Sequence, residues 1–217
     1  MFLAQIWRYP VKSMKGEPLE HAQIGIEGIE GDRIVQVRNS RGGIVTARTR
    51  PALLRHQGTL GPDGVPRVDG RMWTAPDVTR DVEAAAGPGS TLALNYGAGR
   101  FDVLPLLTAT DGAIAAFGED GRRLRPNLVI GGVPGLAERS WEGRFLRIGA
   151  AAIKAVNLRS RCIMTTFDPD TLEQDTGVLR RIQREFGGVM ALNCSVSVSG
   201  HVSVGDPVTL LDGRPVT

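Results

Sequence analysis

Alternating apolar and polar positions in several segments of the chain predict short β-strands. The alternation is loose at residues 2–7 and strict at 195–198 and 201–204, and strands are also expected at 34–38, 44–47, 144–148 and 151–156. Glycine, proline and asparagine separate these segments, which is typical of meanders and hairpins, and Ser199-Gly200 predicts a hairpin between the 195–198 and 201–204 strands. Further strands are expected at 101–107, at 124–130, where a polar head precedes apolar residues, and at 206–211.

Helical spacing is confined to a few short stretches. Apolar residues recur every three to four positions from 178 to 186 and stop at Gly187-Gly188, which predicts a helix. Shorter helices are expected at 51–58, beginning with Pro51, at 78–86 after an Asp77 cap, and at 112–117 after a cap at Thr110 or Asp111. We therefore expect a mainly β fold with a few short helices.

Composition agrees with a turn-rich β protein and allows one large or two small domains. The chain has 217 residues, of which 41% are hydrophobic and only 5% aromatic, with 28 glycines and 13 prolines. These proportions favour strands and turns over a helical bundle. The Gly87–Gly89 break is the expected boundary, which gives an N-terminal β domain at 1–89 and a second domain at 90–217.

Charge and hydropathy narrow the classes of partner. The formal net charge is +3, and arginines alternate with acidic residues, so no basic run indicates nucleic acid or an anionic membrane. No apolar run approaches the roughly 20 residues of a membrane span, and no signal peptide precedes the first strand. We expect a cytoplasmic protein whose two cysteines stay unpaired.

The stretch around Cys162 holds the most specific candidate chemistry. Arg159 and Arg161 flank this cysteine, and nearby cations stabilise a thiolate, the form that acts as nucleophile or metal ligand. Judged on these residues alone, a small buried core cysteine is an equal alternative. A strand is expected to begin near Cys162 and continue to Phe167. Cys194, within an alternating strand and away from basic residues, is interpreted as a core residue.

Other familiar sites find no support in the sequence. Three histidines lie far apart and show no zinc spacing with the cysteines. No glycine-rich phosphate loop, dinucleotide fingerprint or serine nucleophile elbow occurs. Nucleotide hydrolysis and serine catalysis are therefore not expected.

A series of motifs resembles the MOSC-domain proteins, in the order in which that family carries them. In chain order they are Tyr9–Gly16, Gly31–Arg33, Thr46–Arg48 with Pro51, Arg125–Asn127, Arg161–Thr171 and Gly205–Val208. The chain is similar to the branch that includes the mitochondrial amidoxime reducing component and its bacterial relatives. The resemblance implies a MOSC-type β-barrel that follows an N-terminal β subdomain.

This resemblance implies a molybdenum cofactor and assigns residues to it. Cys162 would be the metal ligand and catalytic residue, since a soft thiolate suits molybdenum beside a pterin dithiolene. Lys12, Ser13, Arg33 and Arg48 match the positions that bind the cofactor's phosphate. Arg125, Asn127, Ser160 and Arg161 would contact the pterin or surround the metal. The nucleotide form of the pterin is left open.

The implied activity is the reduction of N-hydroxylated compounds such as amidoximes and hydroxylamines. Two cysteines cannot hold a four-thiolate cluster and no flavin or nicotinamide fingerprint occurs, so an external donor of the flavin, cytochrome or ferredoxin type is expected. The alternatives are a non-catalytic carrier of cofactor or sulfur and a β-barrel module with an unmetallated cysteine. The chain departs from many relatives at Leu172, where they have glycine, and at Val103-Leu104, which replaces hydroxyl residues.

Overall fold

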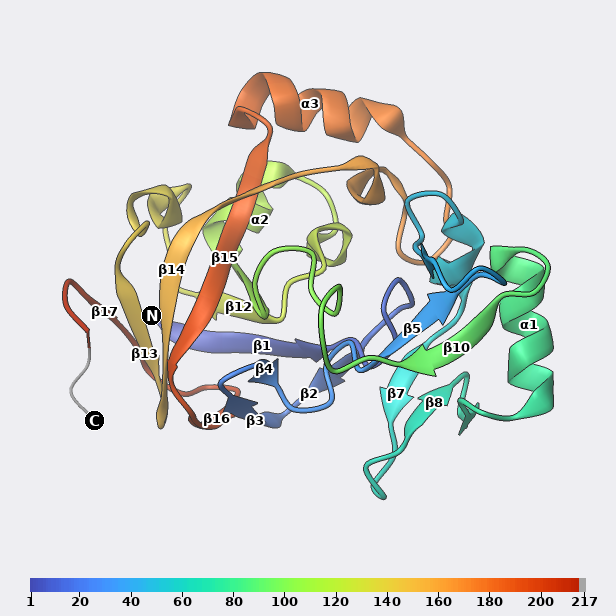
Figure 1. The fold of residues 1–217 in the computed structure, drawn as a ribbon. Coiled ribbons are helices and arrows are strands. Elements are labelled where there is room, and N and C mark those ends of the chain that lie inside the picture. Colours follow the sequence, from blue (N-terminus) through green and yellow to red (C-terminus); the bar gives the residue numbers. More distant parts are fainter. Residues whose placement is uncertain (215–217) are drawn as a thin grey trace.

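The computed structural model describes residues 1–214 and consists mainly of strands, as the sequence predicted (Figure 1). The strands are β1 (Phe2–Arg8), β2 (Glu17–Leu19), β3 (His21–Gly25), β4 (Gly28–Ile29), β5 (Val35–Arg38), β6 (Ile44–Val45), β7 (Gly58–Leu60), β8 (Pro66–Val68), β9 (Arg71–Met72), β10 (Thr91–Leu94), β11 (Leu106–Thr110), β12 (Leu128–Gly131), β13 (Phe145–Ile148), β14 (Ala151–Ser160), β15 (Val189–Val198), β16 (Gly200–Ser203) and β17 (Val208–Leu211).

The helices are short, and local sequence signals set most of their ends. The α-helices are α1 (Pro76–Ala86), α2 (Asp111–Phe117) and α3 (Thr176–Phe186); the 3-10 helices are η1 (Pro51–Arg55), η2 (Gly121–Leu124), η3 (Ala137–Ser140) and η4 (Ile163–Thr166). The Thr110 hydroxyl accepts a hydrogen bond from the Ala113 N–H and so caps α2, while Gly118 ends this helix in the left-handed conformation. Within residues 1–214 no helix has the length and apolar content to cross a bilayer.

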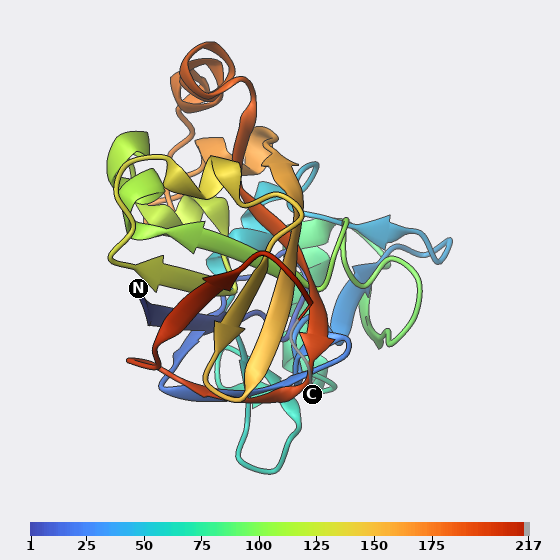
Figure 2. The same cartoon turned by 90° about the vertical axis from the view of Figure 1, so that its left-hand side faces the viewer.

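One large sheet forms the centre of the protein. Its strand order is β17-β13-β14-β15-β11-β12-β1-β2, and β11 and β12 are parallel neighbours while the other pairs are antiparallel. The β17 end of the sheet meets β1, because Phe2 bridges Pro207 and the Val208 N–H donates to the Met1 carbonyl at 3.0 Å. Figure 2 shows these strands curling around a common interior, so the sheet is a barrel closed through β1.

Residues 1–214 also form three smaller sheets, and their apolar side chains form three clusters. One cluster fills the barrel and includes Leu3, Leu128 and Ile153. A second lies among β5, η1 and α1 of the N-terminal half. The third lies under α3, whose Val178, Ile182 and Phe186 are buried as the three-to-four-residue spacing predicted. The N-terminal strand β1 belongs to the large sheet, so both halves of the chain contribute to one barrel.

The predicted hairpin at 195–204 is wrong. β15 pairs with β14 and β11, whereas β16 pairs with β3 in a separate sheet. Gly200 explains the separation, because a Cβ at this position would lie 2.5 Å from the Ala150 carbonyl. The chain crosses another backbone at this glycine and leaves the large sheet.

Three further expectations need correction. The strand expected from 101 begins only at Leu106, because Pro105 lacks an N–H and the residues before it form a loop. The strand expected from Leu124 begins at Leu128, since Arg125 ends η2 in a left-handed conformation. Helix α1 begins at Pro76 without a side-chain cap, and Asp77 instead bonds Arg71 at 2.8 Å.

The strand expected after Cys162 is also wrong, because residues 163–166 form the 3-10 helix η4. The Thr165 hydroxyl donates to the Cys162 carbonyl at 2.9 Å, and the Thr166 hydroxyl donates to the Ile163 carbonyl at 2.7 Å. Such local bonds compete with sheet pairing, which explains why two β-prone threonines end a strand here.

Candidate functional site

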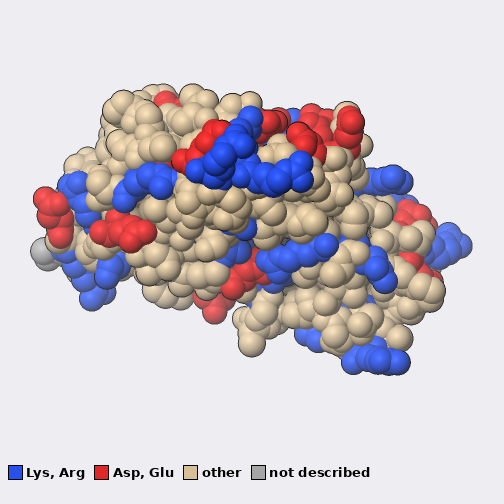
Figure 3. Space-filling view, turned by 90° about the horizontal axis from the view of Figure 1, so that it is seen from above, with Lys and Arg blue, Asp and Glu red and all other residues tan. Residues whose placement is uncertain are grey.

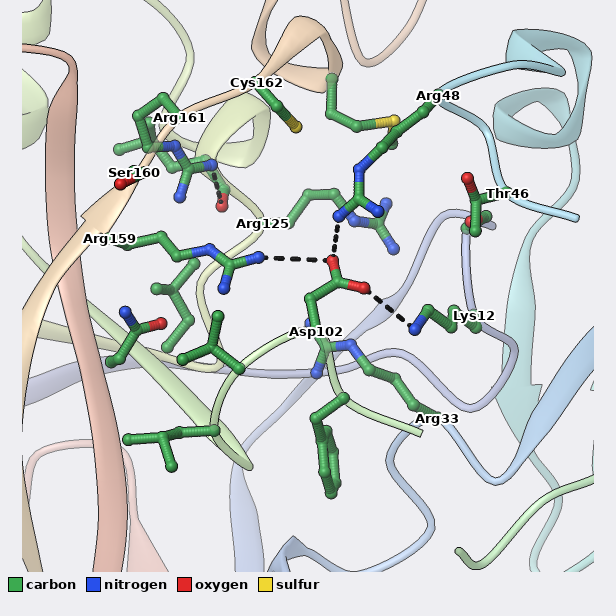
Figure 4. Close-up of a pocket in the computed structure, with 18 of the residues that line it drawn as sticks. Lys12, Arg33, Thr46, Arg48, Asp102, Arg125, Arg159, Ser160, Arg161 and Cys162 are labelled. Carbon is green, nitrogen blue, oxygen red and sulfur yellow. Dashed lines mark hydrogen bonds and ion pairs between the residues drawn. The ribbon is translucent and has the colours of Figure 1, made fainter. Parts of the chain in front are cut away.

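One cleft between the two halves of the chain gathers every residue predicted for the cofactor site. Its lining includes Lys12, Ser13, Arg33, Arg48, Arg125, Asn127, Ser160, Arg161 and Cys162. These residues come from five separate segments. Figure 4 shows the side chains of Lys12, Arg33, Arg48, Arg125, Arg161 and Cys162 around one space.

Turns and strand ends, rather than strand interiors, carry these residues. Lys12 and Ser13 follow β1, Arg33 precedes β5, and Arg48 lies between β6 and η1. The β14 strand reaches the cleft through three irregularities in its pairing with β15, and Cys162 lies two residues beyond its end. Bulges bend and twist a strand, so they aim the end of β14 at the cleft.

Three cleft residues adopt a left-handed backbone that disfavours non-glycine residues. Ser13, Arg33 and Arg125 have φ angles of 73°, 52° and 55°. Each such residue costs on the order of 1 kcal/mol or more and persists only where its surroundings hold it. Backbone strain therefore concentrates at the cleft, as it does at sites built to present side chains.

A buried network fixes Arg33. The Asp32 side chain has no exposed surface; one carboxylate oxygen accepts the Tyr9 N–H at 2.7 Å and the other pairs with the Arg33 guanidinium. Arg33 also donates to the Asn127 amide oxygen at 3.3 Å. Asn127 in turn donates from its amide nitrogen to the Trp7 carbonyl at 3.2 Å. Asn127 thus orients Arg33 at the cleft wall.

Asp102, which the sequence did not single out, lies at the centre of the cleft. Its carboxylate pairs with Lys12 at 3.0 Å, with Arg159 at 3.3 Å and with Arg48 (Figure 4). Burial acts to raise the pKa of Asp102, but Lys12, Arg48 and Arg159 together lower it. The carboxylate therefore stays ionised and holds three cations from different segments together.

Arg125 and Arg161 lie in the cleft wall without a carboxylate partner among residues 1–214. Arg125 donates to the Met14 carbonyl at 2.7 Å and stacks 4.4 Å above the Tyr9 ring. Arg161 donates to the Leu124 carbonyl at 2.8 Å, and its Nε atom is buried with no hydrogen-bond partner in the described chain. Burial lowers the pKa of Arg125 and lowers that of Arg161 to about 10.

Cys162 is partly exposed and its sulfur points into the cleft (Figure 4). Arg48 is the cation beside it. Burial works against the charge of Arg48, but the Cys162 sulfur, as acceptor for the guanidinium, and the charge of Asp102 raise the pKa of Arg48 overall. Cys194 differs completely, since it is fully buried in the barrel and burial raises its pKa to about 12. Its interpretation as a core residue is confirmed.

The cleft carries a large excess of positive charge. Six basic side chains line it, namely Lys12, Arg33, Arg48, Arg125, Arg159 and Arg161. Within residues 1–214, Asp102 is the one acidic side chain in the lining, and Asp32 lies behind Arg33. Such a site favours a polyanion, and the thiol beside it adds a soft metal ligand. The outer face that carries α3 instead shows basic and acidic side chains interspersed (Figure 3).

Several lining residues had no signal in the sequence. Phe101, Asp102, Leu107, Leu124 and Asn193 also line the cleft. Asp102 lies in an apolar run that reads as a buried strand, and its partners are 54 to 90 residues away. The sequence alone does not show that Asp102 lies beside Lys12, Arg48 and Arg159, because only the fold brings these four residues together.

Comparisons of the sequence with known proteins agree with the order of its motifs. Residues 112–209 match the family described as MOSC domain, and residues 1–92 match the MOSC N-terminal beta barrel domain. The human mitochondrial amidoxime-reducing component 1 is 28% identical over 96% of this chain and 82% of its own length. The mitochondrial amidoxime reducing component 2 of Macaca fascicularis is 25% identical over 95% of this chain and 82% of its own. Among solved structures, the YuaD protein from Bacillus subtilis has a TM-score of 0.49 and 13% identity, covering 96% of this chain and 94% of its own.

Proposed function

Since the chain belongs to the MOSC-domain proteins and combines the MOSC domain with the MOSC N-terminal β-barrel domain, we propose that it is a molybdenum-cofactor-dependent oxidoreductase. Its proposed substrates are N-hydroxylated compounds such as amidoximes and hydroxylamines. The observation that carries the proposal is the partly exposed Cys162 thiol in a cleft with six basic side chains. The named activity of relatives at 25–28% identity supports the substrate class.

The residues present fit a phosphorylated pterin with its metal. The unpartnered Arg161 Nε and the arginines without carboxylates leave cationic donors free for an anion, judged over residues 1–214. Lys12, Ser13, Arg33 and Arg48 would hold the phosphate through charge-assisted hydrogen bonds. Arg125, Asn127, Ser160 and Arg161 would face the pterin and the metal. Cys162 would supply the soft thiolate ligand.

When bound, the cofactor would supply two-electron oxygen-atom transfer chemistry. The chain's own residues bind and orient the cofactor and substrate. Thr165 holds the Cys162 carbonyl through its hydroxyl at 2.9 Å and its N–H at 3.0 Å, which fixes the backbone that presents the thiol. Asp102 stays ionised beside three cations, so it serves as a charge partner and not as a proton donor.

The proposed reaction needs electrons from outside the chain. Reduction of N–OH to N–H consumes two electrons and two protons and releases water. Cys194 is buried in the barrel and Cys162 is the proposed metal ligand, so the chain has no thiolates left for an iron–sulfur cluster. A separate electron-transfer protein of the flavin, cytochrome or ferredoxin type is therefore part of the proposal.

Two measurements on the purified protein test this function. Metal analysis with identification of the pterin should find one molybdenum per chain, and protein without molybdenum after expression in a cofactor-producing host would contradict the proposal. Turnover of benzamidoxime with a chemical reductant should then be seen. Bound cofactor without turnover would indicate a carrier instead of an enzyme.

Cys162→Ser is the matched test of the metal ligand. The hydroxyl is a poor ligand for a soft site, so activity should be lost while the thermal melt stays near that of the parent protein. Retained turnover would exclude Cys162 from the mechanism.

A further inference from the structure

A second cavity of about 290 Å³ lies beside the cofactor cleft and takes no part in the proposed reaction. Arg125 and Met164 line both spaces and form the partition between them. The cavity lies where β1, η1 and the segment that follows Cys162 come together, so both halves of the chain contribute walls. Sites between such units are common positions for small ligands.

The walls of this cavity suit an aromatic ring. Trp7, Tyr9 and Phe167 contribute aromatic surface, and Leu54 and Leu172 add aliphatic surface. A cavity of about 150 Å³ is large enough to bind benzene. A space of about 290 Å³ therefore has room for a fused ring that carries one small substituent.

The polar groups of the cavity favour a negative charge on that substituent. Four basic residues but only two acidic ones line it. Arg122 is engaged by Asp120 and Asp170 at 2.6 Å each, whereas the Lys15 ammonium has no ion pair within 4.0 Å among residues 1–214. Arg123 pairs with Asp168 at 3.1 Å and with Glu119 at 3.6 Å, which leaves Lys15 and Arg125 as the lining cations without a carboxylate in the described chain.

Leu172 provides an independent sign that the cavity is a built feature. Its φ angle is 62°, a conformation in which a leucine is strained, yet its side chain packs against the N-terminal apolar cluster and lines the cavity. Strain of this kind persists where the surroundings compensate and clusters at ligand sites. A glycine at this position would adopt the positive φ angle without strain, but it has no side chain to cover this wall of the cavity.

We propose that this cavity binds a small aromatic carboxylate, with the ring among Trp7, Tyr9 and Phe167 and the carboxylate toward Lys15. Met164 and Phe167 lie in and just after η4, the 3-10 helix that begins beside Cys162. The ligand would therefore support the segment that presents the thiol. The inference rests on the cavity alone and does not depend on the proposed reaction.

Isothermal titration calorimetry with 2-naphthoate and its neutral analogue 2-naphthamide tests this site on the full chain. The parent protein should bind naphthoate about tenfold more tightly than the amide, the range expected for one charge-assisted hydrogen bond. Lys15→Gln should remove this preference by weakening naphthoate alone. Leu172→Trp, which fills the cavity, should abolish the binding of both compounds.

Arg48→Gln in the cofactor cleft is the matched control and should leave naphthoate binding unchanged. Loss of binding in this variant but not in Lys15→Gln would locate the carboxylate in the cofactor cleft and overturn the proposal. Absence of binding to the parent protein would overturn it as well. Circular dichroism melts of each variant separate a lost site from a lost fold.

Discussion

Asp102→Asn removes the charge that holds the cleft's cations together, and its effect on stability can be worked from the contacts. Asp102 pairs with Lys12 at 3.0 Å, with Arg159 at 3.3 Å and with Arg48. A direct pair at this distance is worth about 5 kcal/mol in Coulomb energy at an effective dielectric of 20. Desolvation and repulsion among the cations offset most of it, and the side chain is 33% exposed, so we take about 1 kcal/mol per pair.

The cofactor-free variant should therefore lose about 2–3 kcal/mol of unfolding free energy. For a chain of this size that is a fall of roughly 5–10 °C in the melting temperature. Anion binding should change in the opposite direction, because Lys12, Arg48 and Arg159 become available to the ligand. We expect inorganic phosphate to bind at least about tenfold more tightly, a gain of 1.4 kcal/mol.

Circular dichroism melts in phosphate-free buffer and calorimetric titration with phosphate measure both effects. The stability gap between parent and variant should also depend on pH. The folded-state pKa of Asp102 is lowered, so its contribution is complete above the model-peptide value of 3.8 and disappears as pH falls through the lower folded value. Equal melts at pH 7 with unchanged phosphate affinity would refute the assignment of Asp102 as the counter-ion of the cleft.

Other substitutions give shorter tests. Ellman's reagent should label Cys162 alone in the native protein and both cysteines after unfolding. Cys194→Ser should cost about 1–3 kcal/mol of unfolding free energy and should retain the turnover per bound molybdenum. Lys12→Ala should lower molybdenum occupancy more than turnover per bound molybdenum, whereas Arg147→Ala, on the exposed face of β13, should change neither. Burial raises the pKa of Tyr9 to about 12, so a late step in the tyrosinate absorbance titration should vanish in Tyr9→Phe. The stability that this phenol contributes should be complete below pH 10 and lost as pH rises through about 12.

Features of the fold that depend on neighbouring residues could be predicted from the sequence. The spacing of Val178, Ile182 and Phe186 predicted the buried face of α3, and Thr110 and Gly118 marked the ends of α2. Motif resemblance pointed to the residues proposed to bind the cofactor, and the structure brings them to one cleft. Their shared location follows from the fold, which no single motif reveals.

Features that depend on contacts between residues far apart in the sequence could not be predicted. β16 reads as the partner of β15, but a backbone crossing at Gly200 sends it to β3. Asp102 reads as part of a buried strand, but its role depends on cations brought from three distant segments. The η4 turn reads as a strand because threonine favours sheets on average, and the specific hydroxyl bonds of Thr165 and Thr166 reversed that preference.

At Ser13, Arg33 and Arg125, which have left-handed backbones, thermostability and the proposed cofactor binding favour different residues. Glycine at any of these positions would relieve the backbone, yet it would delete a side chain that faces the cleft. A directed-evolution screen that rewards heat resistance of the cofactor-free chain would therefore select against the site itself. If the proposed cofactor binds there, screening with it present would let binding offset the strain and would keep these three residues while the rest of the protein is improved.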